Sequence, residues 1–134
     1  MTWGHAGSPT PADDPTIPDP AKLWRRIFPK WWIQDKNTGG NRLSTQAFED
    51  SKNGTPMSVT IAAESPGQDQ MLARYEGYGL ASLIAADARK CAQALQRAPT
   101  SEDPAHTYVV GRKTGRVKKC LLRGTTMLVV PDYA

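Results

Sequence analysis

Hydrophobic and polar positions divide the chain into short segments rather than one long periodic element. Residues 57–62, MSVTIA, alternate between the two kinds and are rich in β-branched side chains, which is typical of a strand. Residues 106–111, HTYVVG, and 126–130, TMLVV, are predicted strands on similar grounds, and Pro131 ends the second of them. These short strands, separated by polar turns, predict a sheet rather than a helical bundle.

Helical spacing is clearest near the C-terminus. Thr114 is a suitable N-cap, Gly124 a suitable C-cap, and residues 115–122 between them favour a helix. In that helix the apolar positions would face inward, namely Val117, Cys120 and Leu121, and the cations outward, namely Arg112, Arg116, Lys119 and Arg123. A second short helix is predicted over 68–75, with Met71, Leu72 and Tyr75 on one face.

Residues 79–97 allow two interpretations. The segment is rich in alanine, leucine and charged helix formers, so propensity favours one helix over 80–96. The same residues also fit a strand over 80–84, a turn, and a second strand over 92–97. We predict the helix and keep the strand pair as the alternative.

The segment from Ala21 to Asp35 concentrates large aromatic side chains. Pro29 prevents one continuous helix, so we expect a short helix or strand up to Phe28, a turn, and then an extended segment. Large aromatics dominate burial energetics, which makes the following residues predicted core anchors: Leu23, Trp24, Ile27, Phe28 and Trp32. The alternative is a platform of arginine and aromatic side chains on which bases stack.

The domain organisation follows from a change in composition near residue 21. The first 20 of the 134 residues contain five prolines, three aspartates and neither lysine nor arginine. Such a stretch buries too little apolar surface to offset its ordering entropy, so residues 1–20 are predicted to be a disordered, proline-rich tail. Residues 21–134 then form a single globular α+β domain, with a mixed or antiparallel sheet and a few short helices.

Charge is distributed unevenly along the chain. Lys and Arg number 17 and Asp and Glu 13, which gives a formal net charge of +4. Between residues 112 and 123 there are six basic residues and no acidic one. A local excess of one sign attracts partners of the opposite sign, so we expect an anionic partner at 112–123. A protein is the first expectation, a nucleic acid the alternative, and a merely solvated basic face the third interpretation.

The remaining composition excludes several classes. No apolar run long enough to span a membrane and no secretory signal are visible, so we expect a cytoplasmic protein without a membrane partner. Cys91 and Cys120 are the two cysteines, and without evidence of secretion we expect them to be reduced and buried. With two histidines that lack ligand spacing, they make a poor zinc site, so we predict neither a metal nor a cofactor.

Polar residues at 25–26, 42–45, 58 and 106 form the one candidate small-anion site. Its members are Arg25, Arg26, Arg42, Ser44, Thr45, Ser58 and His106. Arg42 with the hydroxyls of Ser44 and Thr45 has the chemistry to bind a phosphate or carboxylate. Ser44 or Thr45 serves equally as a helix N-cap, and His106 serves either as a general base or as a structural donor at a strand end.

Four segments together resemble a known group of sequences. They are RRIFPKW (25–31), RLSTQAF (42–48) followed by MSV (57–59), YGLASL (78–83), and PAHTYVVG (104–111). Their order resembles small bacterial proteins of uncharacterised function, which carry Arg-x-Ser-Ser-x-Ala-Phe, then Ser-Val, then Pro-x-His-Ala before a hydrophobic strand. Thr45 replaces the second serine here, and Thr107 replaces the alanine. The resemblance implies an intracellular bacterial protein, often of mobile or accessory genetic context, and supplies no activity.

The sequence therefore predicts a non-catalytic binding or adaptor module, because no acid, base and nucleophile converge in any motif. The alternatives are a nucleic-acid-binding protein and a small enzyme with an anionic substrate. An ADP-ribosyltransferase-like enzyme is one version of the latter, with Arg26, Ser58 and either Glu64 or Glu102 imitating its site.

Overall fold

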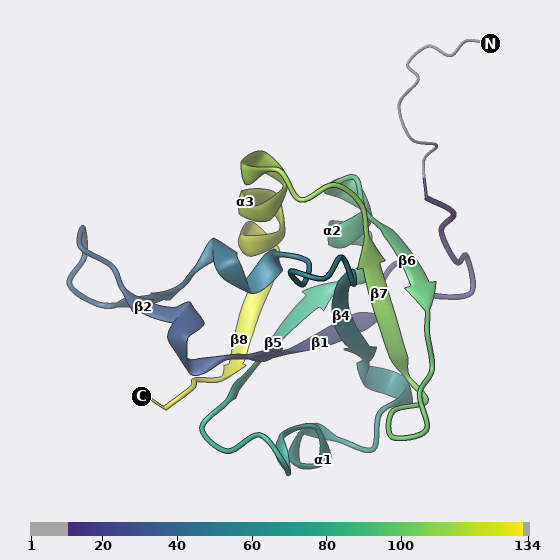
Figure 1. Ribbon diagram of the computed structural model, residues 1–134, viewed down its shortest axis with the longest axis horizontal. Coiled ribbons are helices and arrows are strands. Elements are labelled where there is room, and N and C mark those ends of the chain that lie inside the picture. The colour runs from purple at the N-terminus through teal and green to yellow at the C-terminus, as the bar shows by residue number, and fades with distance from the viewer. Residues whose placement is uncertain (1–10, 133–134) are drawn as a thin grey trace, which may run out of the picture.

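The computed structural model describes residues 11–132 and shows a main antiparallel sheet covered by short helices, with a separate two-stranded sheet beside it (Figure 1). Six strands form this sheet, in the order β6 (Ala94–Arg97), β7 (His106–Val110), β4 (Met57–Ile61), β1 (Lys22–Ile27), β5 (Gly79–Ile84) and β8 (Thr125–Val129). Each strand pairs antiparallel with its neighbours. The predicted α+β class and antiparallel sheet are confirmed.

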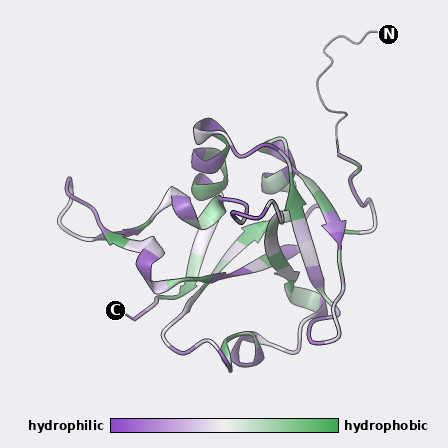
Figure 2. Ribbon diagram, in the orientation of Figure 1, coloured by the Kyte–Doolittle hydropathy of each residue, from purple (hydrophilic) through white to green (hydrophobic). Residues whose placement is uncertain are grey.

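One face of the sheet carries the hydrophobic core. Side chains alternate between the two faces of a strand, which brings Leu23, Val59, Leu83 and Val109 to the same side, where each is at most 3% exposed. The core also takes residues from α2 (Ala85–Lys90), α3 (Gly115–Arg123) and the short 3₁₀ helix η2 (Thr45–Phe48). Figure 2 shows that β4 and β5 are mostly hydrophobic, as expected for strands in the middle of a covered sheet.

The helix α3 matches its prediction closely. The Thr114 hydroxyl accepts a hydrogen bond from the Val117 amide at 3.2 Å, and Gly124 is the C-cap residue. Leu121 is fully buried, while Val117 and Cys120 pack against the core. The four cations predicted to face outward are all exposed.

The long helix predicted over 80–96 is wrong. Residues 79–84 instead form β5, between β1 and β8, and only 85–90 are helical before β6 begins at Ala94. Ala92 has a φ of 64°, a left-handed conformation that an α-helix cannot contain. Pairing with two neighbouring strands overrides the helix propensity of the alanines, and the alternative of two strands is nearer the truth.

Part of the predicted tail belongs to the domain. Residues 11–20 lie along β6, where the Asp14 amide donates to the Leu95 carbonyl at 2.8 Å, and the Leu95 amide donates to the Asp13 carboxylate at 2.9 Å. Ile17 is fully buried in the core. Arg89 of α2 binds the carbonyl of Ile17 and pairs with Asp13. The prediction of disorder is wrong for 11–20, and for residues 1–10 it lies outside the described residues.

The aromatic segment after β1 divides at Pro29, as predicted. The 3₁₀ helix η1 (Pro29–Trp31) leads into β2 (Trp32–Gln34), which pairs with β3 (Asn41–Leu43) as a hairpin that projects from the body in Figure 1. Of the predicted anchors, Leu23 and Ile27 are fully buried, whereas Trp24, Phe28 and Trp32 are half-buried. The short helix predicted over 68–75 is α1 (Gln68–Leu72), and Met71 is its buried residue.

Cys91 and Cys120 form a disulfide, so the expectation of two reduced thiols is wrong. Their sequence separation of 29 residues spans β6 and β7, and their Cα atoms lie 5.7 Å apart. The bond joins the end of α2 to the buried side of α3. Sequence spacing alone could not show that the two helices meet at this point, because their contact depends on how the intervening hairpin folds.

Candidate functional site

The exposed face of α3 is the strongest concentration of unpaired charge in the described structure. Arg116, Lys119 and Arg123 follow one another at helical spacing and line the same shallow hollow with Gly115, while Arg112 precedes the helix. All four cationic side chains are exposed, and within residues 11–132 none makes an ion pair or side-chain hydrogen bond. We call these four residues the basic face.

The other two cations of the segment are neutralised. Lys113 donates to Asp50 at 3.0 Å and to the carbonyls of Val109 and Gly111, and its side chain is only 5% exposed. Lys118 pairs with Glu49 at 3.0 Å. Burial lowers the pKa of Lys113 below its ordinary value, and the nearby Asp50 carboxylate partly offsets this. These pairs attach α3 to η2 and leave the basic face as the available charge.

The predicted small-anion residues converge only in part: one hollow is lined by Arg25, Arg26, Ser58 and His106, whereas its lining does not include Arg42, Ser44 or Thr45. The Ser44 hydroxyl accepts the Gln46 amide at 3.1 Å, so it caps η2, and Thr45 is the first residue of that helix. Arg42 lies in β3, with an exposed side chain whose Nη1 donates to the carbonyl of Leu43 at 3.4 Å. Ser44 therefore has the role of a helix N-cap, the structural alternative that the sequence allowed.

Ser58 and His106 do lie near each other. They are on adjacent paired strands and line a hollow of about 90 Å³, together with Arg25 and Arg26. His106 Nδ1 lies 2.8 Å from the Ala98 carbonyl. Because a carbonyl can only accept, Nδ1 carries the proton, and the histidine is a donor at the strand end. A hollow of this size is small for a substrate, since ligand pockets usually measure about 300 to 1,000 Å³.

The residues that imitate an ADP-ribosyltransferase are only partly assembled. Arg26 lines a hollow with Glu102, but its Nε donates to the Met71 carbonyl at 2.6 Å, and its guanidinium stacks on Tyr75 at 4.0 Å. Glu64 is instead paired with Arg97 at 2.7 Å. Arg26 and Glu64 therefore already have structural partners. Of this set, Glu102 alone has none among the described residues.

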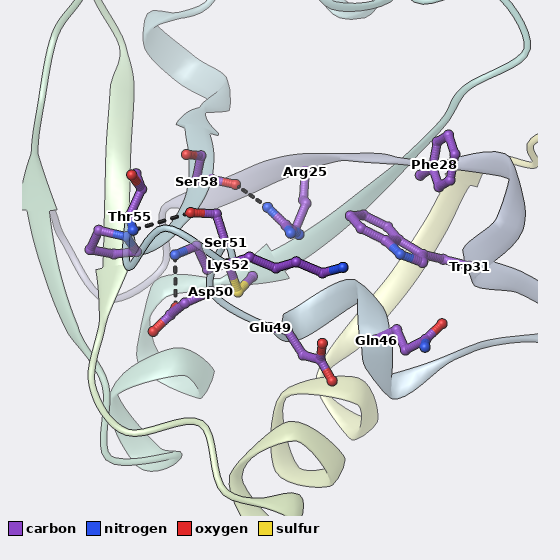
Figure 3. Close-up of a pocket in the computed structure, with 12 residues that line it drawn as sticks. Arg25, Phe28, Trp31, Gln46, Glu49, Asp50, Ser51, Lys52, Thr55 and Ser58 are labelled. Atoms are coloured by element: carbon purple, nitrogen blue, oxygen red, sulfur yellow. Dashed lines mark hydrogen bonds between the residues drawn. The ribbon is translucent and has the colours of Figure 1, made fainter.

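A larger groove beside Ser58 contains a residue that the sequence did not single out. The groove measures about 570 Å³ and brings Arg25 and Trp31 together with Lys52, from the turn before β4 (Figure 3). Arg25 and the neighbouring aromatics were recognisable as a stacking platform. Lys52 was not, because nothing in the local sequence places that turn beside residues 25–31.

Comparison with known proteins gives no assignment: no family model matches the chain, and neither a curated protein nor a solved structure shows significant similarity to it. Within the described residues, no helix has the length and apolar character needed to cross a bilayer. Functional interpretation therefore rests on the geometry described above.

Proposed function

We propose that the protein is a non-catalytic binding module that holds an anionic partner on the basic face of α3. The supporting observation is that Arg112, Arg116, Lys119 and Arg123 are exposed and unpaired within residues 11–132, although acidic residues neutralise the neighbouring Lys113 and Lys118. Unpaired cations on a rigid helix create a local positive potential that attracts and orients an anion.

The composition of the face favours a phosphate backbone over an acidic protein. Protein interfaces usually have an apolar or aromatic centre, and the exposed large hydrophobic residues lie elsewhere, namely Tyr75, Ile84, Leu128 and Val130. Arg116 and Arg123 are separated by seven residues, which is about 10 Å along a helix. That length matches about three nucleotide steps of about 3.4 Å along one strand.

The test is fluorescence anisotropy with labelled duplex and single-stranded oligonucleotides over about 50 to 200 mM salt. If four cations contact phosphates, the affinity for duplex DNA falls with a log–log slope of about 3 to 4. Reversing two charges, Arg116→Glu with Lys119→Glu, abolishes binding. Because both side chains are exposed, unfolding stability changes by less than about 0.5 kcal/mol per site.

A matched control carries the same charge change at exposed positions away from α3, Lys36→Glu with Arg74→Glu, and retains most of the affinity. Leu121→Asp unfolds the domain, because it buries an unpaired charge in the core. Should an acidic polypeptide bind this face and oligonucleotides fail, the partner is a protein. Binding of neither anion means that the basic face is only solvated, and the proposal fails.

The disulfide between Cys91 and Cys120 bears on where in the cell the protein acts. Disulfides persist in oxidising compartments and are rare in the cytosol. The cytoplasmic location expected from the sequence therefore requires Cys91 and Cys120 to be thiols in the cell, unlike in this structure. Quenching cells in acid and alkylating the denatured protein decides the matter, because Cys91 is buried in the fold. Labelled cysteines support the cytoplasm, and unlabelled ones an oxidising compartment.

A further inference from the structure

The sheet opens between its two central strands. β1 and β4 pair only at Leu23 with Ile61 and at Trp24 with Thr60, although β1 continues to Ile27 and β4 begins at Met57. The groove introduced above lies where this pairing stops, with Arg25, Met57 and Ser58 among its lining residues. The groove is therefore bordered by the stretches of β1 and β4 that no ladder joins.

The guanidinium of Arg25 occupies this gap. Its Nε donates to the Ala47 carbonyl at 2.5 Å, and Nη1 donates to the Ser58 carbonyl at 2.8 Å. Burial lowers the pKa of Arg25 to about 10, and Asp50 partly opposes the shift, so the group is charged at neutral pH. Within the described residues Nη2 has no acceptor, and no carboxylate makes an ion pair with Arg25.

The charges around the groove do not cancel at Arg25. Glu49 and Asp50 both line it, but Lys118 and Lys113 of the α3 region neutralise them. Lys52, by contrast, makes no ion pair in the part of the chain described, and Figure 3 shows its side chain extending toward Arg25 and Trp31. Two cations that make no ion pair within the described residues thus line the same groove, where one anion could contact both.

The other walls of the groove are aromatic. Trp31 lies under the Arg25 guanidinium at 5.2 Å from its ring centroid, and Phe28 packs against Trp31 with the ring centroids 5.9 Å apart. Both rings line the groove (Figure 3). Indole and guanidinium planes stack on flat ligands, and a volume of about 570 Å³ is within the usual range for small-molecule sites.

We propose that this groove binds a small ligand in which a planar ring carries a phosphate or carboxylate. The ring lies against Trp31 and Phe28, and the anionic group accepts hydrogen bonds from Arg25 Nη2 and the Lys52 ammonium. The site is separate from the basic face of α3, because none of its lining residues belongs to that face.

Isothermal titration calorimetry with adenosine 5′-monophosphate and with indole-3-carboxylate tests the proposal, because each probe combines a flat bicyclic ring with an anion, a phosphate in the first and a carboxylate in the second. We expect at least one to bind saturably, and adenosine or indole, which lack the anion, to bind at least tenfold more weakly. Saturable binding of only one probe shows which of the two combinations of ring and anion the groove accepts. Absence of saturable binding for both probes overturns the proposal.

Variants keep the test independent of folding and of the proposed function. Lys52 lies in an exposed turn, so Lys52→Ala leaves the domain folded. This variant reduces the affinity for the probe at least tenfold. Arg25→Gln removes the second cation, and Trp31→Leu removes the stacking wall. The charge reversal at Arg116 and Lys119 leaves probe binding unchanged. If that reversal abolishes probe binding while Lys52→Ala has no effect, the probes bind α3 and the groove is not their site.

Discussion

Lys113 shows how one residue fixes the position of the basic segment. Its ammonium group is enclosed by the Asp50 carboxylate and by two backbone carbonyls just before α3, and its side chain is 5% exposed. A charge so well enclosed is tolerated only when its hydrogen-bonding positions are filled. Lys113 thus anchors the start of the basic segment instead of contributing to its exposed charge.

We predict that Lys113→Ala lowers the free energy of unfolding by about 2 to 4 kcal/mol, because two carbonyls lose the ammonium donor and Asp50 keeps the Met57 amide but loses its cation. Asp50 is 36% exposed and therefore keeps part of its hydration, which limits the effect. Urea denaturation followed by circular dichroism measures the change. Lys118→Ala is the control, since its partner Glu49 is 51% exposed and the loss is below about 1 kcal/mol. Equal losses in the two variants would contradict this account.

Single residues also mark what sequence could reveal of the candidate site. The exposure of Arg116, Lys119 and Arg123 follows from helical periodicity and is confirmed, and Arg112, which precedes the helix, is exposed as well. The neutralisation of Lys113 by Asp50 was not predictable, because the two residues meet only through the packing of α3 on η2. The role of Lys52 was not predictable for the same reason, because only the fold brings its turn beside Arg25 and Trp31 in the groove.

At the scale of elements, local signals succeeded where structure is local. Thr114 and Gly124 cap the two ends of α3, so its bounds follow from residues next to it in the chain. Pro29 separates β1 from β2 by an equally local effect. β5 depends instead on β1 and β8, its neighbours in the sheet, and so the helix prediction failed there. Residues 11–20 are ordered because the edge of β6 and Arg89 supply partners that composition alone cannot show.

The docking of residues 11–20 is predicted to weaken in acid. The Asp14 carboxylate accepts bonds from the Thr16 hydroxyl and amide and lies near Arg97, so its pKa is below the ordinary 3.8. The folded state therefore binds this proton less readily than the unfolded state. The stabilisation that the ionised Asp14 carboxylate contributes to the folded state is present above pH 3.8 and is lost as the pH falls through the lowered pKa of Asp14.

The chemical shift of the Thr16 amide proton, followed by NMR during an acid titration, measures this change. We expect a transition centred below pH 3.8 that accompanies loss of the bond to Asp14. The variant Asp14→Asn has no such transition at Thr16. A transition at or above the ordinary pKa of an aspartate would contradict the prediction.

At the scale of the molecule, a disulfide and a short seam determine how the parts are held together. The seam is the two-residue pairing of β1 with β4, which joins the strands β6, β7 and β4 to the strands β1, β5 and β8. The disulfide joins α2 to α3. Because α3 packs against η2, the cross-link also helps to hold the layer that covers the core and borders the groove.

We predict that reducing this disulfide lowers stability by about 3 to 4 kcal/mol, since the bond closes a loop of 29 residues in the unfolded chain. For a domain of this size the melting temperature falls by about 10 °C. Thermal unfolding with and without a phosphine reductant measures the effect. The double variant Cys91→Ser with Cys120→Ser should melt at the same temperature as the reduced wild type, and the reductant should not change that temperature. An unchanged melting temperature of the wild type under reductant would exclude a stabilising cross-link.

The two ends of the sheet differ in a way that bears on assembly. Residues 13 and 14 occupy the outer side of β6, whereas within residues 11–132 no strand pairs with the outer side of β8. β8 carries no charge, and its Leu128 is 41% exposed. The sheet can therefore grow in one direction only. Two copies joined through β8 would form a continuous sheet capped at both ends, so growth would stop at a dimer. Removing the chain through residue 14, which leaves the buried Ile17 in place, would remove the cap and allow the sheet to extend into a fibre.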